Sequence, residues 1–371
     1  MLALNMSAEL PSNRRKSTYS RIADALRAEI MSGQRAVGAQ LPSTNELAVQ
    51  LRASPYTIHT ALTKLVKEGW LERLNGTGTY VVDPGKRFVR AGIYHSVDIC
   101  SNEHPAFNRS VHALLLEKFK QRGKETHIFM DTRPIEQQVE LLPALEKALE
   151  ERSIQCLVAP SISTYSGPAL QRIKIPTAFL GLPDSDHHIS SNMWDFFAET
   201  CRHLVAQGCR SVAVISTFHD GLRQVGDEFY QLFEEAMRAH NLVTRPEWIR
   251  RADHHIFDWE ADAFGYREFH RLWQGEEKPD ALIVYPDILV RGVAAAILEL
   301  GIAAKAPNMK YVFHRNAHIA QFCPFPVTWM VSDEDAWAEA LIRVVEKQFD
   351  GEKTSPLLIP FTLQENILPS R

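Results

Sequence analysis

The sequence predicts a mixed α/β protein with a small N-terminal head and a larger, doubly wound body of two lobes. In the first eighty or so residues, apolar side chains recur at helical spacing and then alternate around Asn75-Gly76, the strongest short signal for a β-hairpin. From Arg90 onward, short apolar runs typical of buried parallel strands alternate with helical patterns. The 371 residues are enough for two or three domains.

Three helices are expected in the head. The first covers residues 19–32, with apolar residues on one face and Gly33 after its end. Ser43 and Glu46 have the spacing of a capping box, which predicts the start of the second helix. Ser54 followed by Pro55 predicts the N-cap and first turn of the third helix. Two short helices followed by a hairpin predict a winged helix-turn-helix.

The outward face of the third helix is predicted to meet DNA. It combines short polar side chains that can read base edges with lysines that can neutralise phosphate. Its members are Tyr56, Thr57, His59, Thr60, Thr63, Lys64 and Lys67. The helix starts at Ser43 and Ser54 can offer backbone N–H groups to phosphates, and Gly76 and Gly78 let the hairpin tip approach the duplex closely.

Charge agrees with this division only weakly. The net charge is −4; residues 1–85 carry ten Lys and Arg against seven Asp and Glu, and the remainder carries 31 against 38. A head of +3 on a body of −7 favours a nucleic-acid partner for the head. Composition alone leaves open a solvated helix on a purely structural module.

The body begins at residue 90. Its strands are expected at the apolar runs 90–96, 125–131, 154–160, 175–181, 210–216, 281–285 and 309–314. Its helices are expected at 111–122, 137–152, 194–207, 224–240 and 288–300. We therefore predict a head at 17–83, a linker at 84–89 and a two-lobed domain for effector binding and dimerisation at 90–371.

The pattern "LPS...ELA..L..S..T...AL..L..EGWL....GTGTYV" resembles the DNA-binding head of GntR-type transcription regulators over residues 18–83. The resemblance implies DNA contacts from Asn45, Ser54, Tyr56, Thr57, His59, Asn75, Gly76 and Thr77, and we also predict a contact from Thr44. Members of the family often carry arginine where this chain has Asn45, Pro55 and His59. These departures predict a lower phosphate affinity and an atypical operator.

The body resembles the sugar-binding domain of LacI/GalR-type repressors, which is akin to periplasmic binding proteins. The similarity runs through "AGIYHS", "HPAFNRSVHALLLEKFKQRG", "IPTAFLG", "AETCRHLVAQGCRSVAVIS", "PDALIVYPDILVRGVAAAILELGI" and "MKYVFHRN". It implies a small molecule bound between the lobes, at the carboxyl ends of strands. The effector residues that it implies are Tyr94, Phe107, Arg223 and Asp287.

The stretch "VFHRN" departs from this family, which usually has an aspartate where Arg315 stands, beside His314. Two arginines facing one cleft, Arg223 and Arg315, would suit a carboxylate or phosphate, because guanidinium binds both in a bidentate manner. We therefore hypothesise an acidic or phosphorylated sugar as effector. The alternative is that Arg315 turns away and pairs with Asp333 or Asp335.

Other classes of function find little support. The chain has no nucleophile elbow, P-loop or dinucleotide-binding turn, so we expect neither catalysis nor a cofactor. Five scattered cysteines and the two "DHH" stretches at 186–188 and 253–255 do not have the spacing of a metal site. No signal peptide or apolar span is evident, which predicts a cytoplasmic protein.

The resulting prediction is a ligand-responsive transcription regulator, a repressor of carbohydrate-related genes that acts as a homodimer on a pseudo-palindromic operator. A stand-alone small-molecule receptor without regulatory DNA binding is the alternative. Sequence-selective DNA binding that a small molecule alters would separate the two.

Overall fold

The protein is described by a computed structural model that covers residues 17–83, 88–101, 106–163, 165–182, 184–218, 225–254, 256 and 258–365, without the side chains of 225–227 and 258. The chain divides into two compact units. The first contains residues 1–90 with 148–155, and the second contains 91–147 with 156–371. Each unit is described by itself.

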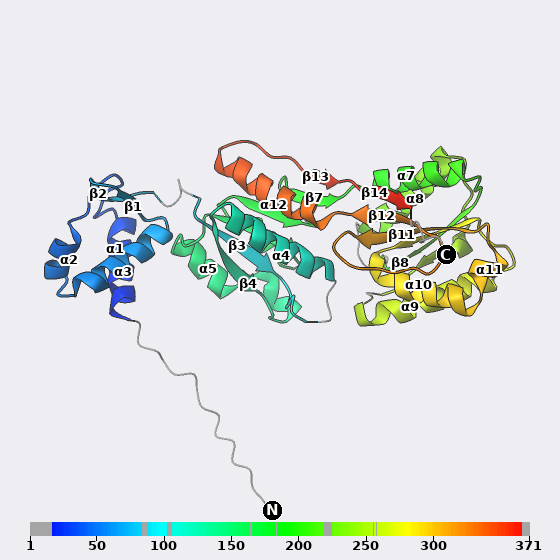
Figure 1. Cartoon of the computed structure of the whole chain (residues 1–371), viewed down its shortest axis with the longest axis horizontal. Coiled ribbons are helices and arrows are strands. Elements are labelled where there is room, and N and C mark those ends of the chain that lie inside the picture. Colours follow the sequence, from blue (N-terminus) through cyan, green and yellow to red (C-terminus); the bar gives the residue numbers. More distant parts are fainter. Residues whose placement is uncertain are drawn as a thin grey trace, which may run out of the picture. The chain divides into compact units, whose positions relative to one another are not determined.

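The head consists of three helices and one hairpin, drawn in blue in Figure 1. Its elements are α1 (Thr18–Met31), α2 (Thr44–Gln50), α3 (Pro55–Lys67), β1 (Leu71–Leu74) and β2 (Gly78–Val81). The antiparallel register pairs Leu71 with Val81 and Leu74 with Gly78, which leaves residues 75–77 as the tip. This is the winged helix-turn-helix that the sequence predicts.

One apolar cluster holds these elements together. It is formed mainly by Ala23, Leu26, Ile30, Leu47, Ile58, Ala61, Leu62, Leu65, Trp70 and Leu71. The helical members recur every three or four residues, so each helix turns one apolar stripe inward. Beside this core, the guanidinium of Arg27 donates to Glu68 over 2.5 Å and ties α1 to the end of α3.

The second unit contains two six-stranded sheets. The first has the order β13-β7-β6-β5-β3-β4, and the second has the order β14-β12-β11-β10-β8-β9. The strands of the first are β3 (Arg90–His95), β4 (Glu125–Met130), β5 (Cys156–Ser161), β6 (Thr177–Leu180), β7 (His188–Ser191) and β13 (Leu357–Ile359). The strands of the second are β8 (Val212–Ser216), β9 (Ile249–Arg251), β10 (Ala281–Tyr285), β11 (Lys310–Asn316), β12 (Thr328–Ser332) and β14 (Thr362–Glu365).

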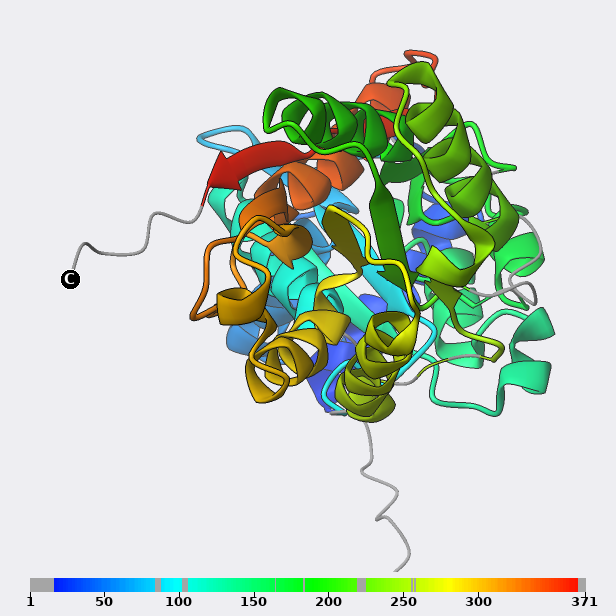
Figure 2. The same cartoon turned by 90° about the vertical axis from the view of Figure 1, so that its right-hand side faces the viewer.

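The second sheet is covered on both faces, as its continuous apolar strands require. One face packs against α7 (Met193–Ala206) and α8 (Val225–Ala239). The other packs against α9 (Asp258–Gln274) and α10 (Val290–Glu299), and Figure 2 shows this layering. Adjacent strands pair in parallel, apart from antiparallel β14 beside β12. This is a doubly wound lobe.

The chain passes between the two sheets after β7, after β12 and after β13. Helix α12 (Glu334–Phe349) follows β12 of the second sheet but packs against α4 (Ala106–Gln121), β5 and β6 of the first lobe. The remaining helices are α5 (Pro143–Glu150), α6 (Gly167–Leu170), α11 (Ile302–Lys305) and the short η2 (Ile135–Val139), η3 (Pro246–Trp248) and η4 (Asp287–Leu289). Among the described helices, none is both long and apolar enough to cross a membrane.

The predicted fold class is confirmed, but one predicted helix is wrong. The helical pattern over 137–152 is divided into η2 and α5, because Pro143 cannot continue a helix and disfavours helical backbone in the residue before it. Helix α4 also starts at Ala106, five residues before its predicted start at Val111. The described elements that were not predicted include α6, α9, α11 and α12 among the helices and β7, β9, β12, β13 and β14 among the strands.

Candidate DNA-binding surface and effector site

The start of α2 has the predicted capping box. Ser43 Oγ accepts from the Glu46 backbone N–H over 3.3 Å, and Glu46 Oε2 accepts from the Ser43 N–H over 2.8 Å. The hydrogen bond from the Ser43 backbone holds the pKa of Glu46 below its usual value. The bond places a carboxylate at this helix start, so the N–H groups left for a phosphate are fewer than predicted. Asn45 is exposed, and Thr44 is half-buried.

Helix α3 presents Tyr56 and His59 to solvent, and the exposed fraction of Tyr56 is 80%. Ser54 Oγ accepts from the Thr57 N–H over 3.1 Å, as the sequence predicts for an N-cap. The two hydroxyl groups of Ser54 and Thr57 lie 2.8 Å apart. Thr60 Oγ1 donates to the Tyr56 carbonyl over 2.9 Å, so its hydroxyl proton is used inside the helix.

Lys64 does not share this exposed face. Its Nζ donates to Ser20 Oγ of α1 over 3.2 Å and lies 3.9 Å from Glu68 Oε1. The structure therefore separates Lys64 from the other residues predicted to meet DNA. Spacing on a helix gives the side of the residue but not the direction in which a long, flexible side chain extends.

The hairpin tip is bare, as predicted. Asn75, Gly76, Thr77 and Gly78 are exposed, and Gly76 has φ +75°. Gly78 has φ +136°, and a Cβ there would lie 2.5 Å from Gln40 Nε2. That nitrogen donates to the Thr77 carbonyl over 2.6 Å, so a side chain before α2 supports the tip.

A groove of about 990 Å³ runs between the start of α2 and the hairpin. It is lined by Gln40, Leu41, Pro42, Ser43, Thr44, Glu46, Gln50, Arg73, Leu74, Asn75, Gly76, Thr77, Gly78 and Thr79. Six of the residues predicted to bind DNA lie here, whereas Gln40 and Arg73 were missed. Arg73 could have been found from the alternation of β1, which places it on the same side as buried Leu71 and therefore toward α3.

In the second unit, Tyr94 and Phe107 lie in the first lobe. Tyr94 is almost fully buried in β3, and its hydroxyl donates to Asp131 Oδ2 over 3.1 Å. Burial raises the pKa of Tyr94. Asp131 also accepts two bonds of 2.7 Å from Arg133, so this tyrosine belongs to a satisfied polar cluster. Phe107 packs edge-on against Trp337, with ring centres 5.5 Å apart.

Asp287 and His314 are brought together at the carboxyl ends of β10 and β11. The Asp287 backbone N–H donates to His314 Nδ1 over 3.0 Å. Burial lowers the pKa of His314 to about 3, so the ring is neutral at pH 7. Its proton then lies on Nε2, which is buried without a hydrogen-bond partner among the described residues.

Asp287 is buried, with an exposed fraction of 7%, and its carboxyl group accepts a hydrogen bond from the side chain of Asn316. Burial raises the pKa of Asp287 to about 6, and the nearby charge of Glu334 adds to the rise. Asn316 was not predicted. It follows His314 by two residues in the same strand and therefore shares its face, which a period of two could have indicated.

Arg315 faces away from this group because successive residues of a strand point to opposite sides. Its Nη2 donates to Gln364 Oε1 over 2.7 Å, and its guanidinium carbon lies 5.5 Å from the centre of the Trp329 ring. Its partner is thus neither Asp333 nor Asp335, which were the predicted alternatives. Arg223 lies outside the described residues.

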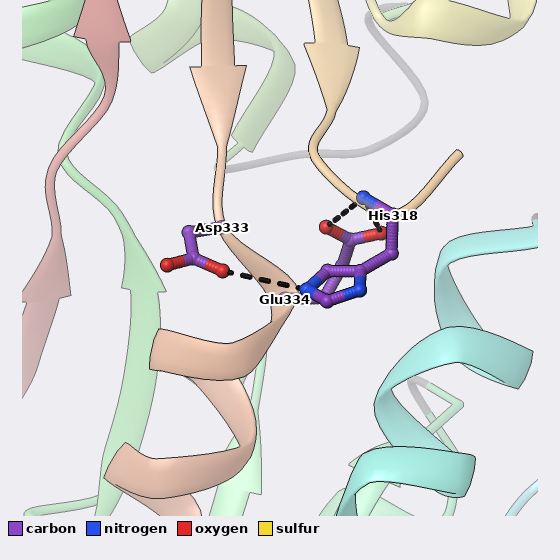
Figure 3. Close-up of side chains that lie close together, drawn as sticks. All are labelled: His318, Asp333 and Glu334. Atoms are coloured by element: carbon purple, nitrogen blue, oxygen red, sulfur yellow. Dashed lines mark hydrogen bonds and ion pairs between the residues drawn. The ribbon is translucent and has the colours of Figure 1, made fainter. Parts of the chain in front are cut away.

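His318, Asp333 and Glu334 are a second polar group, at the start of α12 (Figure 3). They bring one ligand-type atom each within 4.8 Å of one another. Both oxygens of buried Glu334 accept from the His318 backbone N–H, over 3.3 and 3.1 Å, and Asp333 caps the helix by accepting from the Asp335 N–H. A helix N-terminus stabilises carboxylates by itself. We therefore interpret this group as a helix cap.

Comparison with known proteins agrees with both parts of the chain. Residues 18–81 match the family model of bacterial regulatory proteins of the gntR family, and residues 201–363 match that of a periplasmic binding protein-like domain. The HTH-type transcriptional repressor PurR of Actinobacillus pleuropneumoniae is 24% identical over 183 residues, 48% of this chain and 52% of the repressor. The chain thus spans about half the length of that relative.

A longer match, 23% identical over 316 residues and 77% of each protein, is the arabinose metabolism transcriptional repressor of Halalkalibacterium halodurans. Among solved structures, a LacI family transcription regulator from Clostridium acetobutylicum covers 76% of this chain and 100% of its own, with a TM-score of 0.59 and 17% identity. The Cra transcriptional dual regulator of Pseudomonas putida in complex with fructose 1-phosphate covers 76% of this chain and 100% of its own, with a TM-score of 0.54 and 18% identity.

These two structural likenesses concern the fold alone, and they agree with the two parallel-sheet lobes. The match to the gntR model covers the three helices and the hairpin of the head. Residues 18–81 are therefore a GntR-type winged helix-turn-helix domain, and the body contains a periplasmic-binding-protein-like domain.

Proposed function

We propose that the protein is a ligand-responsive, sequence-specific DNA-binding transcription regulator, a repressor of carbohydrate-related genes, rather than an enzyme. The observation that carries the proposal is the exposed surface of the head. Tyr56, His59 and Asn45 are free to reach base edges, beside a bare hairpin tip. The names of the relatives, which are transcriptional repressors of the PurR and arabinose-metabolism kinds, support the same function.

The test of DNA binding starts from random DNA rather than from a chosen operator. The full chain is incubated with a random-sequence duplex pool, bound duplexes are recovered and sequenced over several rounds, and the affinity for the selected site is compared with that for the pool. A preference of about a thousandfold or more is expected for a specific regulator. Enrichment of no sequence would contradict the proposal and favour the stand-alone receptor.

Two variants locate the base contacts. Tyr56→Ala and His59→Ala remove exposed side chains, so both proteins should fold normally. Each should weaken the preference for its base pair by about 1–3 kcal/mol. Leu298→Ala, at a half-exposed site in the body, is the matched control and should leave the selected sequence unchanged. An unchanged selection with both head variants would remove α3 as the reading element.

For the effector we infer a small sugar-like molecule at the carboxyl ends of β10 and β11. Support comes from Asp287 and Asn316, which place hydrogen-bonding groups where doubly wound folds bind ligands. An acidic or phosphorylated sugar is a second candidate, which is favoured by the fructose 1-phosphate bound to the P. putida regulator. Arg315 gives this candidate no support in its present orientation.

Thermal-shift measurements separate the two candidates. Neutral sugars, sugar acids and fructose 1-phosphate are each added to the wild type and to Arg315→Gln. Stabilisation by neutral sugars alone would remove the acidic effector. Stabilisation by fructose 1-phosphate that persists in Arg315→Gln would leave Arg223 as the candidate partner, whereas loss in that variant would show that Arg315 reorients. No response to any sugar would contradict a carbohydrate effector.

We also propose a homodimer on a pseudo-palindromic operator, because one head offers few base contacts. Helix α4 is one candidate for the interface, but its Leu115 and Phe119 are completely buried in their own lobe. Only the other side of this helix remains for a partner. Sedimentation of the full chain together with the symmetry of the selected duplex tests the dimer, and a non-symmetric site bound by a monomer would contradict it.

A further inference from the structure

We infer that Arg73 is the cation through which the head binds a DNA phosphate between the hairpin and α3, in place of the predicted Lys64. The inference rests on the proposed DNA binding and adds a residue that was not among the predicted DNA contacts. It names the chemistry of the contact, a guanidinium and a backbone phosphate, and makes no claim about base sequence.

Arg73 lies between the hairpin and α3. It is an exposed residue of β1, and it lines the groove together with Asn75, Gly76 and Ser43. Its Nη2 donates to Thr63 Oγ1 over 3.1 Å and approaches the His59 carbonyl at 3.5 Å. The side chain therefore connects the hairpin with the exposed side of α3. A duplex that takes α3 in its major groove and the hairpin tip in the adjoining minor groove presents its backbone between the two.

Lys64 and Arg73 differ in the partners that they already have. Lys64 lies beside the carboxylate of Glu68 and donates to Ser20, toward α1. The described hydrogen bonds of Arg73 instead end on a hydroxyl and a carbonyl, both neutral acceptors at exposed positions. A phosphate offers a stronger, charge-assisted and bidentate partner to the same guanidinium. Arg73 can exchange its neutral partners for the phosphate, whereas Lys64 would have to leave both Ser20 and the carboxylate of Glu68.

The experiment measures how the affinity for duplex depends on salt. Binding of the full chain to a random-sequence duplex is followed by fluorescence anisotropy over a series of salt concentrations. Each phosphate contact contributes about 0.9 to the slope of log K against log[salt]. Arg73→Gln should reduce the slope by about 0.9 for each bound head. Arg73→Lys should retain the slope, because it retains the charge.

Two further variants exclude a merely structural role. Lys64→Gln should retain the slope of the wild type. Thr63→Ala removes the acceptor hydroxyl but leaves the cation, so it should also retain the slope. A reduced slope in Thr63→Ala would show that the bond inside the head is what matters, and it would overturn the inference.

An unchanged slope in Arg73→Gln, or a loss in Lys64→Gln equal to the loss expected for Arg73→Gln, would overturn the inference and leave the proposed function intact. A wild type that binds no duplex even at low salt would instead remove the proposed function itself. Thermal melting of each variant is recorded alongside. Because Arg73 is exposed, Arg73→Gln should fold like the wild type, and the slopes are compared at a temperature at which both are folded.

Discussion

The head and the second lobe place their candidate residues in opposite ways. In the head, Asn45, Tyr56 and Asn75 are exposed, and each lies next to the local signal that predicts its element. In the second lobe, Asp287, His314 and Asn316 are buried, and they come from two strand ends far apart along the chain. The difference shows that a surface for a large, rigid partner can be built from local structure, whereas a site for a small molecule depends on the packing of strand ends.

The largest test asks whether the two parts are independent. Leu65→Ala empties a completely buried position of the head core, so it should cost about 2–5 kcal/mol of the head's unfolding free energy. Calorimetry should show a lower melting temperature for the head and an unchanged transition for the body. Val49→Ala, at a site 80% exposed, should change neither. A joint shift of both transitions would break the comparison.

The second test concerns the buried acid. The pKa of Asp287 is raised to about 6, so in the folded state the acid gains its proton at higher pH than in the unfolded chain. The contribution of Asp287 to the free energy of unfolding is therefore greatest below the unfolded pKa of about 4. It is lost as the pH rises toward 6, by roughly 1.4 kcal/mol per pH unit. Asp287→Asn should remove this loss from the unfolding free energy measured with denaturant at each pH.

The contribution of His314 to stability changes with pH in the opposite direction. Its pKa is lowered to about 3, so its contribution is present above the unfolded pKa of about 6.5 and is lost as the pH falls. In the wild type the two effects oppose each other between about pH 4 and 6. Asp287→Asn should therefore make stability rise more steeply with pH in this window. The exposed Asp184→Asn is the control, and identical profiles for wild type and Asp287→Asn would show that Asp287 titrates normally.

A third substitution tests whether the close approach of Gly78 to Gln40 holds the hairpin tip in place. Gly78→Ala puts a Cβ at φ +136° and 2.5 Å from Gln40 Nε2, which should cost about 1–3 kcal/mol of stability and displace the tip. Affinity for duplex should fall with it. Gly76→Asn is matched to it, because Gly76 has φ +75° with open space around it and asparagine tolerates that backbone. Equal losses in both variants would mean that contact with Gln40 is unimportant.

The smallest expected effect belongs to the helix caps. Ser54→Ala removes the acceptor of the Thr57 N–H and should cost about 1 kcal/mol, measured by thermal unfolding of the head. Ser17 occupies the same position before α1 but its side chain makes no capping bond, so Ser17→Ala is the matched control. A similar cost for Ser17→Ala would mean that the loss does not arise from capping.

Much of the head could be predicted because its signals are local. Ser43 and Ser54 were expected as caps, and Asn75-Gly76 as the centre of a hairpin, since each motif is completed within a few residues. Lys64 was placed on the right helix but not in the right direction, because Ser20, its partner, is 44 residues away. The helix predicted over 137–152 is wrong for a local reason, because Pro143 cannot continue a helix and starts a new one.

In the body, the strand pattern predicted the doubly wound class but only part of the site. Arg315 was predicted to face the cleft with Arg223 because it stands where the family usually has an aspartate, yet the alternation of β11 turns Arg315 toward Gln364. Asn316 was missed for the same reason. The domain boundaries and the effector residues remain predictions.

By itself, the sequence determined the order of elements, the caps, the hairpin and the class of both parts, because hydrogen bonds and apolar periodicity act over a few residues. The tertiary structure decided which side chains are free and which are paired. The hydrogen bonds of Lys64 with Ser20, of Arg73 with Thr63 and of Glu334 with His318 form only when segments distant in the sequence pack together. Partners of long polar side chains depend on distances in space, which the spacing of residues along the chain does not fix.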